Sequence, residues 1–404
     1  MTRQLMKGIR VIDFTDFLAG PYCSMYFADM GAEVIKIENL VSHGNFTRNA
    51  LPHEKNSDLS MYWGNLNRGK KNVALNLKSE DGRKLFAKLV ESADVLIENN
   101  RPGVMKRLGF GYDDCKQLNP RLIYASISGY GQTGPNQKKP GYDIIAQAMG
   151  GSMSITGFPG GEPLRAGMAI GDMFAALNAS TAICASLYER EFSGKGNYID
   201  VALVDSIFSG MEAKMMTYVY TGKSPEPTGN RYLTSAPYDL YWAKDSCYVI
   251  ASGTDKHFEL LSAVMGMPEL ATDPKYCDTP ARNLHFQELK DIVNKWGADK
   301  TVDEVCKLID SVGVPVAPIY NCEKAANDPA IAVDRQMLVK VPAPANHPEA
   351  GELTVIGNAI HMPESPCTYD TPHFDLGQDN MEVFSALGFS EEELAHMKEE
   401  NVIC

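Results

Sequence analysis

The sequence lacks the signals that usually place a chain in a membrane or at a metal. No run of apolar residues approaches the roughly 18 to 20 that a membrane-spanning helix requires. Its nine cysteines and eight histidines are dispersed, without a C-x-x-C or H-x-x-x-H pair. Such spacing predicts neither a disulfide framework nor a metal site. Residues 1–8 lead into an apolar segment without the features of a signal peptide, so we expect a cytoplasmic protein.

Positive charge is outnumbered, with 38 lysines and arginines against 51 aspartates and glutamates. The formal net charge of −13 argues against a nucleic-acid partner, which requires a basic surface. The basic residues nevertheless form two local groups: Arg68, Lys70, Lys71 and Lys78, then Arg101, Lys106 and Arg107. In an acidic protein such groups suit either a confined anion site or a solvated surface.

The first third of the chain alternates between strand and helix patterns. Strands are predicted at 9–14, 33–38, 94–97 and 121–127, and helices at 22–30 and 80–91. This alternation predicts a Rossmann-like α/β domain with a parallel sheet covered on both faces.

The remainder of the chain has a different pattern. An apolar helix, expected to be buried, is predicted over 173–189, and a segment rich in turn formers follows at 221–229. A second, smaller α+β domain is predicted beyond it, with a strand at 248–251 and helices at 257–265, 286–296 and 302–312. The tail predicts a final helix over 382–398.

A Rossmann-like beginning raises the question of a dinucleotide cofactor. Nicotinamide enzymes place G-x-G-x-x-G after the first strand, where the glycines let the backbone approach the pyrophosphate. This chain has Thr15 to Pro21 there instead, with a single glycine at Gly20. NAD binding is therefore disfavoured.

A series of short motifs, in the same order along the chain, resembles the class III coenzyme A transferases. That family includes formyl-CoA and carnitine CoA transferases and the α-methylacyl-CoA racemases. The similarity covers essentially the whole chain. The motifs are Asp13-Phe14-Thr15, Ala19-Gly20-Pro21, Gly31 to Glu38, Asn67 to Lys71, Leu75 to Lys78, Glu98 to Gly103, Gly129-Tyr130-Gly131, Gly141-Tyr142-Asp143, Gly171-Asp172 and Gly194-Lys195-Gly196.

The resemblance implies an architecture that periodicity alone does not. It implies a discontinuous large domain of residues 1–200 and 330–404, a small domain of 225–325, and linkers at 201–224 and about 326–340. It also implies an interlocked homodimer, in which each subunit threads through the other. No membrane or nucleic-acid partner is expected.

Asp172 has two interpretations. From its position before an apolar helix it is most simply a helix N-cap. The resemblance instead makes it the nucleophile that moves CoA from an acyl-CoA to a free carboxylic acid, through an aspartyl mixed anhydride and an aspartyl-CoA thioester. This reaction requires no cofactor beyond the coenzyme A of the substrate.

The resemblance also implies contacts with CoA. They fall on Leu75, Lys78, Asn99, Arg107 and Lys139. Cationic donors suit phosphates, although Lys78 and Arg107 equally fit surface salt bridges. Asn99 could instead cap a following helix, and Lys138 competes with Lys139 for the same role.

Three positions of the expected substrate pocket bear on the reaction. Formyl-CoA transferases have glutamine at Leu18, arginine at Asn39 and a run of four glycines that is missing here, which disfavours oxalate or formate. Racemases have histidine at Tyr142, and a phenol is a poor general base near neutral pH. Asp143 either positions a substrate or caps a loop.

Transfer is therefore favoured over two alternatives, a racemase-like isomerase and a noncatalytic CoA-binding protein. The acceptor acid stays open among betaines, dicarboxylates, hydroxy acids and aromatic acids.

Overall fold

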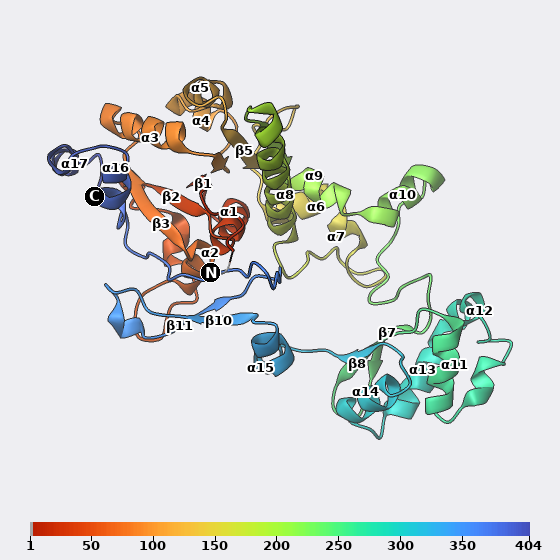
Figure 1. The fold of residues 1–404 in the computed structure, drawn as a ribbon. Coiled ribbons are helices and arrows are strands. Elements are labelled where there is room, and N and C mark those ends of the chain that lie inside the picture. Colours follow the sequence, from red (N-terminus) through yellow and green to blue (C-terminus); the bar gives the residue numbers. More distant parts are fainter. Residues whose placement is uncertain (1–2) are drawn as a thin grey trace. The chain divides into compact units, whose positions relative to one another are not determined.

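The computed structural model describes residues 3–404, which form two compact units. The large unit contains the residues up to Ser152, Arg165–Met216 and Pro329–Cys404 (Figure 1). The small unit contains Met153–Leu164 and Thr217–Asp328. The chain therefore leaves the large unit twice and returns to it each time.

The large unit is built on a parallel sheet of six strands in the order β3-β2-β1-β4-β5-β6. The strands are β1 Arg10–Phe14, β2 Glu33–Asn39, β3 Lys70–Leu75, β4 Val95–Glu98, β5 Ile123–Ser128 and β6 Tyr198–Ala202. The strand order reverses between β1 and β4. In such sheets the ligand crevice lies beyond the carboxyl ends of the strands at this switch point.

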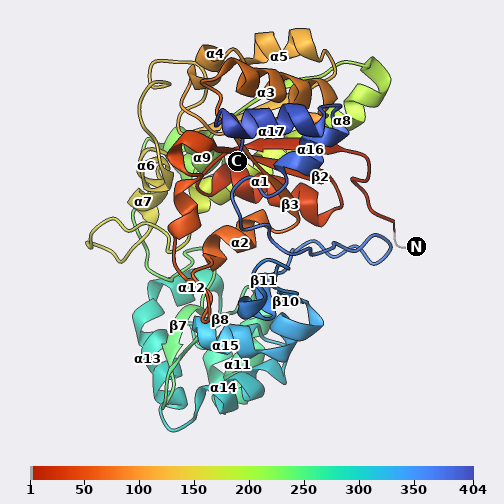
Figure 2. The same cartoon turned by 90° about the vertical axis from the view of Figure 1, so that its left-hand side faces the viewer.

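Helices cover both faces of the sheet, which confirms the expected Rossmann-like α/β architecture (Figures 1 and 2). One face packs against α3 Glu80–Ser92, α4 Val104–Leu108, α5 Tyr112–Leu118, α16 Asn380–Ala386 and α17 Glu391–Glu399. The other face packs against α1 Ala19–Asp29, α6 Asp143–Met149, α8 Ile170–Ser193 and α9 Leu203–Ser209. The large unit also contains helix α2 Met61–Asn67. A separate antiparallel hairpin is formed by the strands β10 Leu338–Val341 and β11 Leu353–Ile356.

Contrary to the sequence expectation, helix α8 is long and apolar enough to cross a membrane by length and composition alone. One side of it, including Ala175, Ala179 and Ile183, is buried in the core against the sheet. Its other side is exposed in the single chain, as Tyr188 and Phe192 show. The expectation of an entirely buried helix is thus wrong for the isolated chain, because only one side of α8 meets the sheet.

Two elements differ from the sequence expectations. The predicted tail helix over 382–398 is broken into α16 and α17, with Gly388 between them at a φ of 95°. That left-handed backbone conformation suits glycine and ends a helix. The expected linker 201–224 contains α9 and α10 Glu212–Thr221.

The small unit has an antiparallel sheet in the order β7-β8-β9, covered by amphipathic helices. Its strands are β7 Tyr238–Trp242, β8 Cys247–Ala251 and β9 Val316–Pro318. Its helices are α11 Asp255–Val264, α12 Thr279–Leu284, α13 Phe286–Gly297, α14 Val302–Asp310 and α15 Cys322–Asn327. A further short helix, α7 Ser152–Ile155, lies where the chain first leaves the large unit.

Candidate functional site

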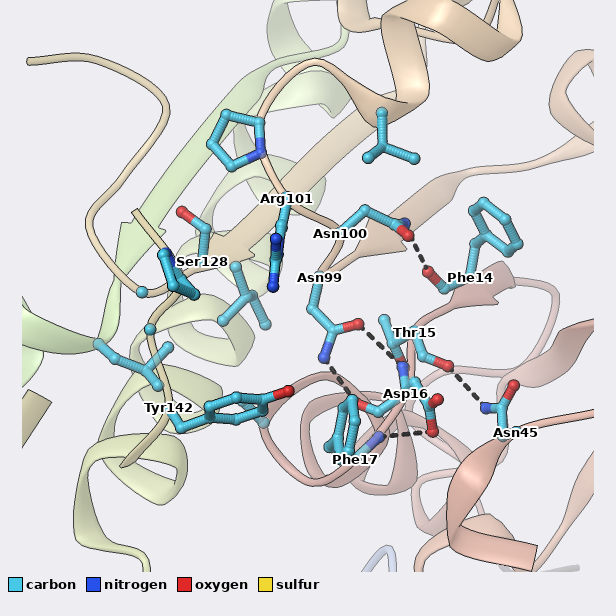
Figure 3. A pocket seen from close by; sticks show the side chains of 18 of the residues that line it. Phe14, Thr15, Asp16, Phe17, Asn45, Asn99, Asn100, Arg101, Ser128 and Tyr142 are labelled. Carbon is cyan, nitrogen blue, oxygen red and sulfur yellow. Dashed lines mark hydrogen bonds between the residues drawn. The ribbon is translucent and has the colours of Figure 1, made fainter. Parts of the chain in front are cut away.

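A cavity of about 540 Å³ lies at the carboxyl ends of the strands of the large unit (Figure 3). Its walls come from the segments that follow β1, β2, β4 and β5, which meet at the switch point of the sheet. Asp172 of α8 also lines it. The fold therefore brings the predicted nucleophile to the edge of the sheet where ligands of such folds bind.

The loop after β1 is held by side-chain amides from neighbouring segments (Figure 3). Asn99 Oδ1 accepts a hydrogen bond from Asp16 N at 2.8 Å, and Asn99 Nδ2 donates to Asp16 O at 2.6 Å. Asn45 Nδ2 donates to Thr15 O at 2.9 Å. Asn99 is therefore a support of this loop rather than a helix cap. Phe17, which follows, has a φ of 61°, a left-handed conformation that is uncommon for a bulky residue.

Buried charges lie beneath the same loop. Lys36 Nζ donates to Thr15 O and to Asp13 Oδ1, the latter at 3.1 Å. Lys70 Nζ donates to Asp13 Oδ2 at 3.0 Å, and all three charged side chains are buried. Burial alone would raise the pKa of Asp13, but the two lysines hold that pKa well below its ordinary value. The first loop of the cavity thus rests on a buried ion network.

Asp172 is the third residue of α8, whose N-cap is Ala169. The simple capping interpretation of Asp172 is therefore wrong. Within residues 3–404, no group donates a hydrogen bond to its carboxylate. Burial, and then the nearby charge of Asp143, raise the pKa of Asp172 to about 7. The result is a carboxylate at a cavity wall with free oxygens and an unusually high proton affinity.

The three expected pocket residues occupy different places. Tyr142 lines the cavity, and its ring meets the Phe17 ring edge-on with 5.7 Å between centroids. Asp143 does not line the cavity; its Oδ1 accepts a hydrogen bond from Gly171 N at 2.8 Å. Leu18 packs instead against the apolar cluster around Met25.

The residues expected to contact CoA are also divided. Asn99 and Lys139 line the cavity, whereas Leu75, Lys78 and Arg107 do not. The Leu75 side chain is fully buried in the core, so any contact with CoA would come from its backbone. Lys78 and Arg107 are exposed outside the cavity, and their contacts with CoA remain predictions.

Several lining residues were not among the predicted site residues. They include Asp16, Asn45, Asn100 and Arg101, all on segments that follow strands of the sheet. Arg101 belongs to a local basic group and to the motif Glu98 to Gly103, but the sequence assigns it no role in a site. Its position soon after the predicted strand at 94–97 was the available signal, because strand ends of a parallel sheet converge on one edge.

No group of three or more histidine, cysteine, aspartate or glutamate side chains within the described part of the chain is arranged to hold a metal ion. The cavity offers amides, two cations and two carboxylates, those of Asp172 and of Asp16, whose Oδ1 accepts a hydrogen bond from Phe17 N. Such a set can bind anionic groups and supply a carboxylate nucleophile.

The sequence and the fold are similar to those of known proteins. The sequence profile of the family described as CoA-transferase family III matches residues 6–380. An acetyl-CoA:oxalate CoA-transferase of Acetobacter aceti is 41% identical over 91% of this chain and 90% of its own length. A succinyl-CoA–D-citramalate CoA-transferase of Chloroflexus aurantiacus is 36% identical over 98% of both chains. The crystal structure of a CAIB/BAIF family protein from Brucella suis is 32% identical, with a TM-score of 0.85 over 96% of this chain and 100% of that one.

Proposed function

This chain belongs to CoA-transferase family III, and we propose that it moves CoA from an acyl-CoA to a free carboxylic acid with Asp172 as the nucleophile. The observation that carries the proposal is the place of Asp172. Its carboxylate lines the cavity at the switch point of the sheet and is not engaged by another donor of the described chain.

The first half of the reaction is a transfer of the acyl group to the protein. An oxygen of the ionised Asp172 carboxylate attacks the thioester carbonyl, the carbon–sulfur bond breaks, and CoA thiolate leaves. The product is a mixed anhydride between Asp172 and the donor acid. The thiolate then attacks the Asp172 carbonyl carbon, which releases the donor carboxylate and forms an aspartyl-CoA thioester.

The second half repeats these steps in reverse order. The acceptor carboxylate attacks the aspartyl thioester carbonyl and displaces CoA thiolate, which gives a second mixed anhydride. The thiolate attacks the carbonyl carbon of the acceptor, and Asp172 leaves as a carboxylate. No proton or electron is gained or lost over the cycle, so a single carboxylate suffices as the covalent group.

The surroundings of Asp172 suit this chemistry. A position in the first turn of α8 places backbone N–H groups and the positive end of the helix dipole near the oxygens that gain charge during acyl transfer. Partial burial of Asp172 keeps water away from the anhydride. Lys139 and Arg101 supply positive charge for the phosphates of CoA or for a carboxylate.

For the acceptor we propose a small dicarboxylic acid. The support comes from the relatives that are named for oxalate and for D-citramalate, both dicarboxylic acids. The oxalate-named relative weakens the expectation against oxalate that was based on Leu18 and Asn39. The second cation of the cavity would pair with the carboxylate that does not react.

We further propose that the enzyme works as an interlocked cytoplasmic homodimer without a metal or redox cofactor. The exposed apolar side of α8 supports a partner surface on the large unit, since a row of exposed aromatic residues is unusual for a monomer.

Purified protein incubated with acetyl-CoA or succinyl-CoA and a panel of acids tests the proposal. We expect a new acyl-CoA, detected by mass spectrometry, and a hydroxylamine-labelled Asp172 during turnover. Asp172→Ala should abolish transfer with little change in CoA affinity, whereas Asp205→Ala, at an exposed acid of α9, should be fully active.

Full turnover by Asp172→Ala would refute the assignment of Asp172 as the nucleophile. Exchange of an α-proton without an acceptor would indicate a racemase, and binding without chemistry a noncatalytic protein.

A further inference from the structure

A buried glutamine behind the cavity is not accounted for by the steps above. Gln147 lies on α6, is fully buried, and does not line the cavity. Its Nε2 donates to Asp143 Oδ2 at 2.7 Å and to Met168 O at 3.4 Å, and its Oε1 accepts from Ala166 N at 2.8 Å. A carboxylate can only accept and a backbone N–H can only donate, so these partners fix the orientation of the amide.

The partner of Gln147 continues this chain of hydrogen bonds to the proposed nucleophile. Asp143 uses one carboxylate oxygen for Gln147 and the other for Gly171 N, at 2.8 Å. Gly171 is the residue before Asp172 and lies in the first turn of α8. Two side chains of α6 therefore hold three points of the segment 166–171: Ala166 N, Met168 O and Gly171 N.

These contacts replace a cap that α8 lacks. The first turn of a helix has N–H groups without partners inside the helix, which usually find a side-chain acceptor at the N-cap. The N-cap of α8 is Ala169, which has no side-chain acceptor. Asp143 supplies the acceptor from another helix, and Gln147 fixes the direction in which Asp143 points.

The same contacts close the base of an excursion of the chain. Between Gln147 and Ala166 the chain passes through residues 153–164, which belong to the small unit. The chain returns to the large unit at Arg165, only seven positions before Asp172. The hydrogen bonds from Ala166 N and Gly171 N, made directly after this return, fix the start of α8 relative to α6.

We propose that Gln147 is a positioning residue for Asp172: through Asp143 and Ala166 it fixes the first turn of α8, and so holds the Asp172 carboxylate against the cavity. This inference rests on the proposed nucleophile. It assigns no chemical step to Gln147, which touches neither the cavity nor the reacting atoms. A small displacement of a nucleophile is costly, because about 1 Å can lower a rate by about a hundredfold.

The test uses Gln147→Met, which keeps the length of the side chain and removes all three hydrogen bonds. We expect kcat to fall about tenfold or more while KM for the acyl-CoA changes less than about threefold, since a positioning defect acts on the chemical step. Hydrogen–deuterium exchange should rise in the peptide that covers 166–173 and stay unchanged in β1 and β4. Ser186→Ala removes a buried hydroxyl further along α8 and should change neither quantity.

Gln147→Glu provides a second variant if the methionine variant does not fold. It keeps the acceptor for Ala166 N but replaces the donor to Asp143 with a second carboxylate, so we expect the same loss of kcat and faster exchange at Gly171. Wild-type exchange in 166–173, or wild-type kcat despite faster exchange, would overturn the positioning role. Full turnover by Asp172→Ala would instead overturn the nucleophile, while the exchange data would still report on the contacts of Gln147.

Discussion

At the scale of single residues, the surroundings of Asp172 decide when it can attack. A carboxylate is nucleophilic only when ionised, and burial together with Asp143 raises its pKa to about 7. Near neutral pH a substantial share of the free enzyme would therefore carry a proton on the attacking group. The ionised, reactive fraction of Asp172 therefore changes with pH near neutrality.

This arrangement predicts a dependence of kcat/KM on pH. Because the pKa of Asp172 is raised, protonation removes the nucleophile as the pH falls, so kcat/KM should rise up to about pH 7 and level off above it. Asp143→Asn should move the rising limb to lower pH, since it removes a negative charge near Asp172. Initial rates in a series of buffers from about pH 5 to 9 would show this. A flat profile over that range would contradict the raised pKa.

Two adjacent lysines offer a matched comparison for CoA binding. Lys139 lines the cavity and Lys138 does not, although both are exposed and carry the same charge. We expect Lys139→Met to raise the Kd for free CoA about three- to tenfold, because a cation–phosphate contact is lost, and Lys138→Met to change it little. Isothermal titration calorimetry measures both. Equal effects would mean that only general charge attraction is involved.

The sequence predicted some site residues and not others for identifiable reasons. Gly171-Asp172 could be found only through resemblance, because an aspartate before an apolar helix is ordinarily a cap. The core position of Leu75 and the turning of Leu18 towards the cluster around Met25 depend on packing, which spacing does not reveal. The sequence allows Asp143 either to position a substrate or to cap a loop, and the hydrogen bond that it accepts from Gly171 N favours the structural role.

At the scale of elements, β3 was missed for a physical reason. Its first residues, Lys70 and Lys71, are charged and do not resemble a central strand. Lys70 is nevertheless buried, because Asp13 at the centre of the sheet supplies the opposite charge. A pairing between positions 57 residues apart does not appear in hydrophobic periodicity. By contrast β1, β2, β4 and β5 were predicted, because apolar residues still dominate them, although the buried charges Asp13, Lys36 and Glu38 interrupt the apolar runs of β1 and β2.

The same ion network predicts a stability effect. Lys36→Met leaves Asp13 with one cation and removes the donor to Thr15 O, so we expect a loss of about 3 kcal/mol or more in the free energy of unfolding. Lys71→Met should cost less than about 1 kcal/mol, because the ion pairs of Lys71 are partly exposed. Urea unfolding followed by circular dichroism compares the two. Equal stability of both variants would show that the buried pair contributes nothing net.

At the scale of the whole molecule, resemblance implied that the large domain is discontinuous, but it did not indicate the excursion of residues 153–164 into the small unit. That segment is short, and its glycines and prolines (Gly157, Pro159, Gly160, Gly161 and Pro163) indicate a loop without indicating the unit to which the loop belongs. Hydrophobic patterns identify elements, whereas the assignment of a short segment to one unit or another depends on contacts that are far apart in the sequence.

The exposed side of α8 leads to a prediction about assembly. Tyr188 and Phe192 of one chain are 71% and 75% exposed, and a partner subunit would cover them. If the proposed dimer is interlocked, its subunits cannot separate without unfolding, so its mass should persist on dilution to nanomolar concentration. Two differently tagged dimers should not exchange subunits under native conditions, as followed by native mass spectrometry.

Joint unfolding in urea and refolding is the control for this assembly test, because it lets the chains pair at random and should give about half mixed dimers. A monomer, or rapid subunit exchange without denaturant, would contradict interlocking. Rapid exchange would still be compatible with a dimer held by an ordinary surface contact. Phe192→Asp separates these cases further. In a simple dimer, a charge on this surface should cause dissociation into monomers whose free energy of unfolding is unchanged. In an interlocked dimer the subunits should stay together, and the charge should lower the urea midpoint of unfolding, because assembly and folding are then one process.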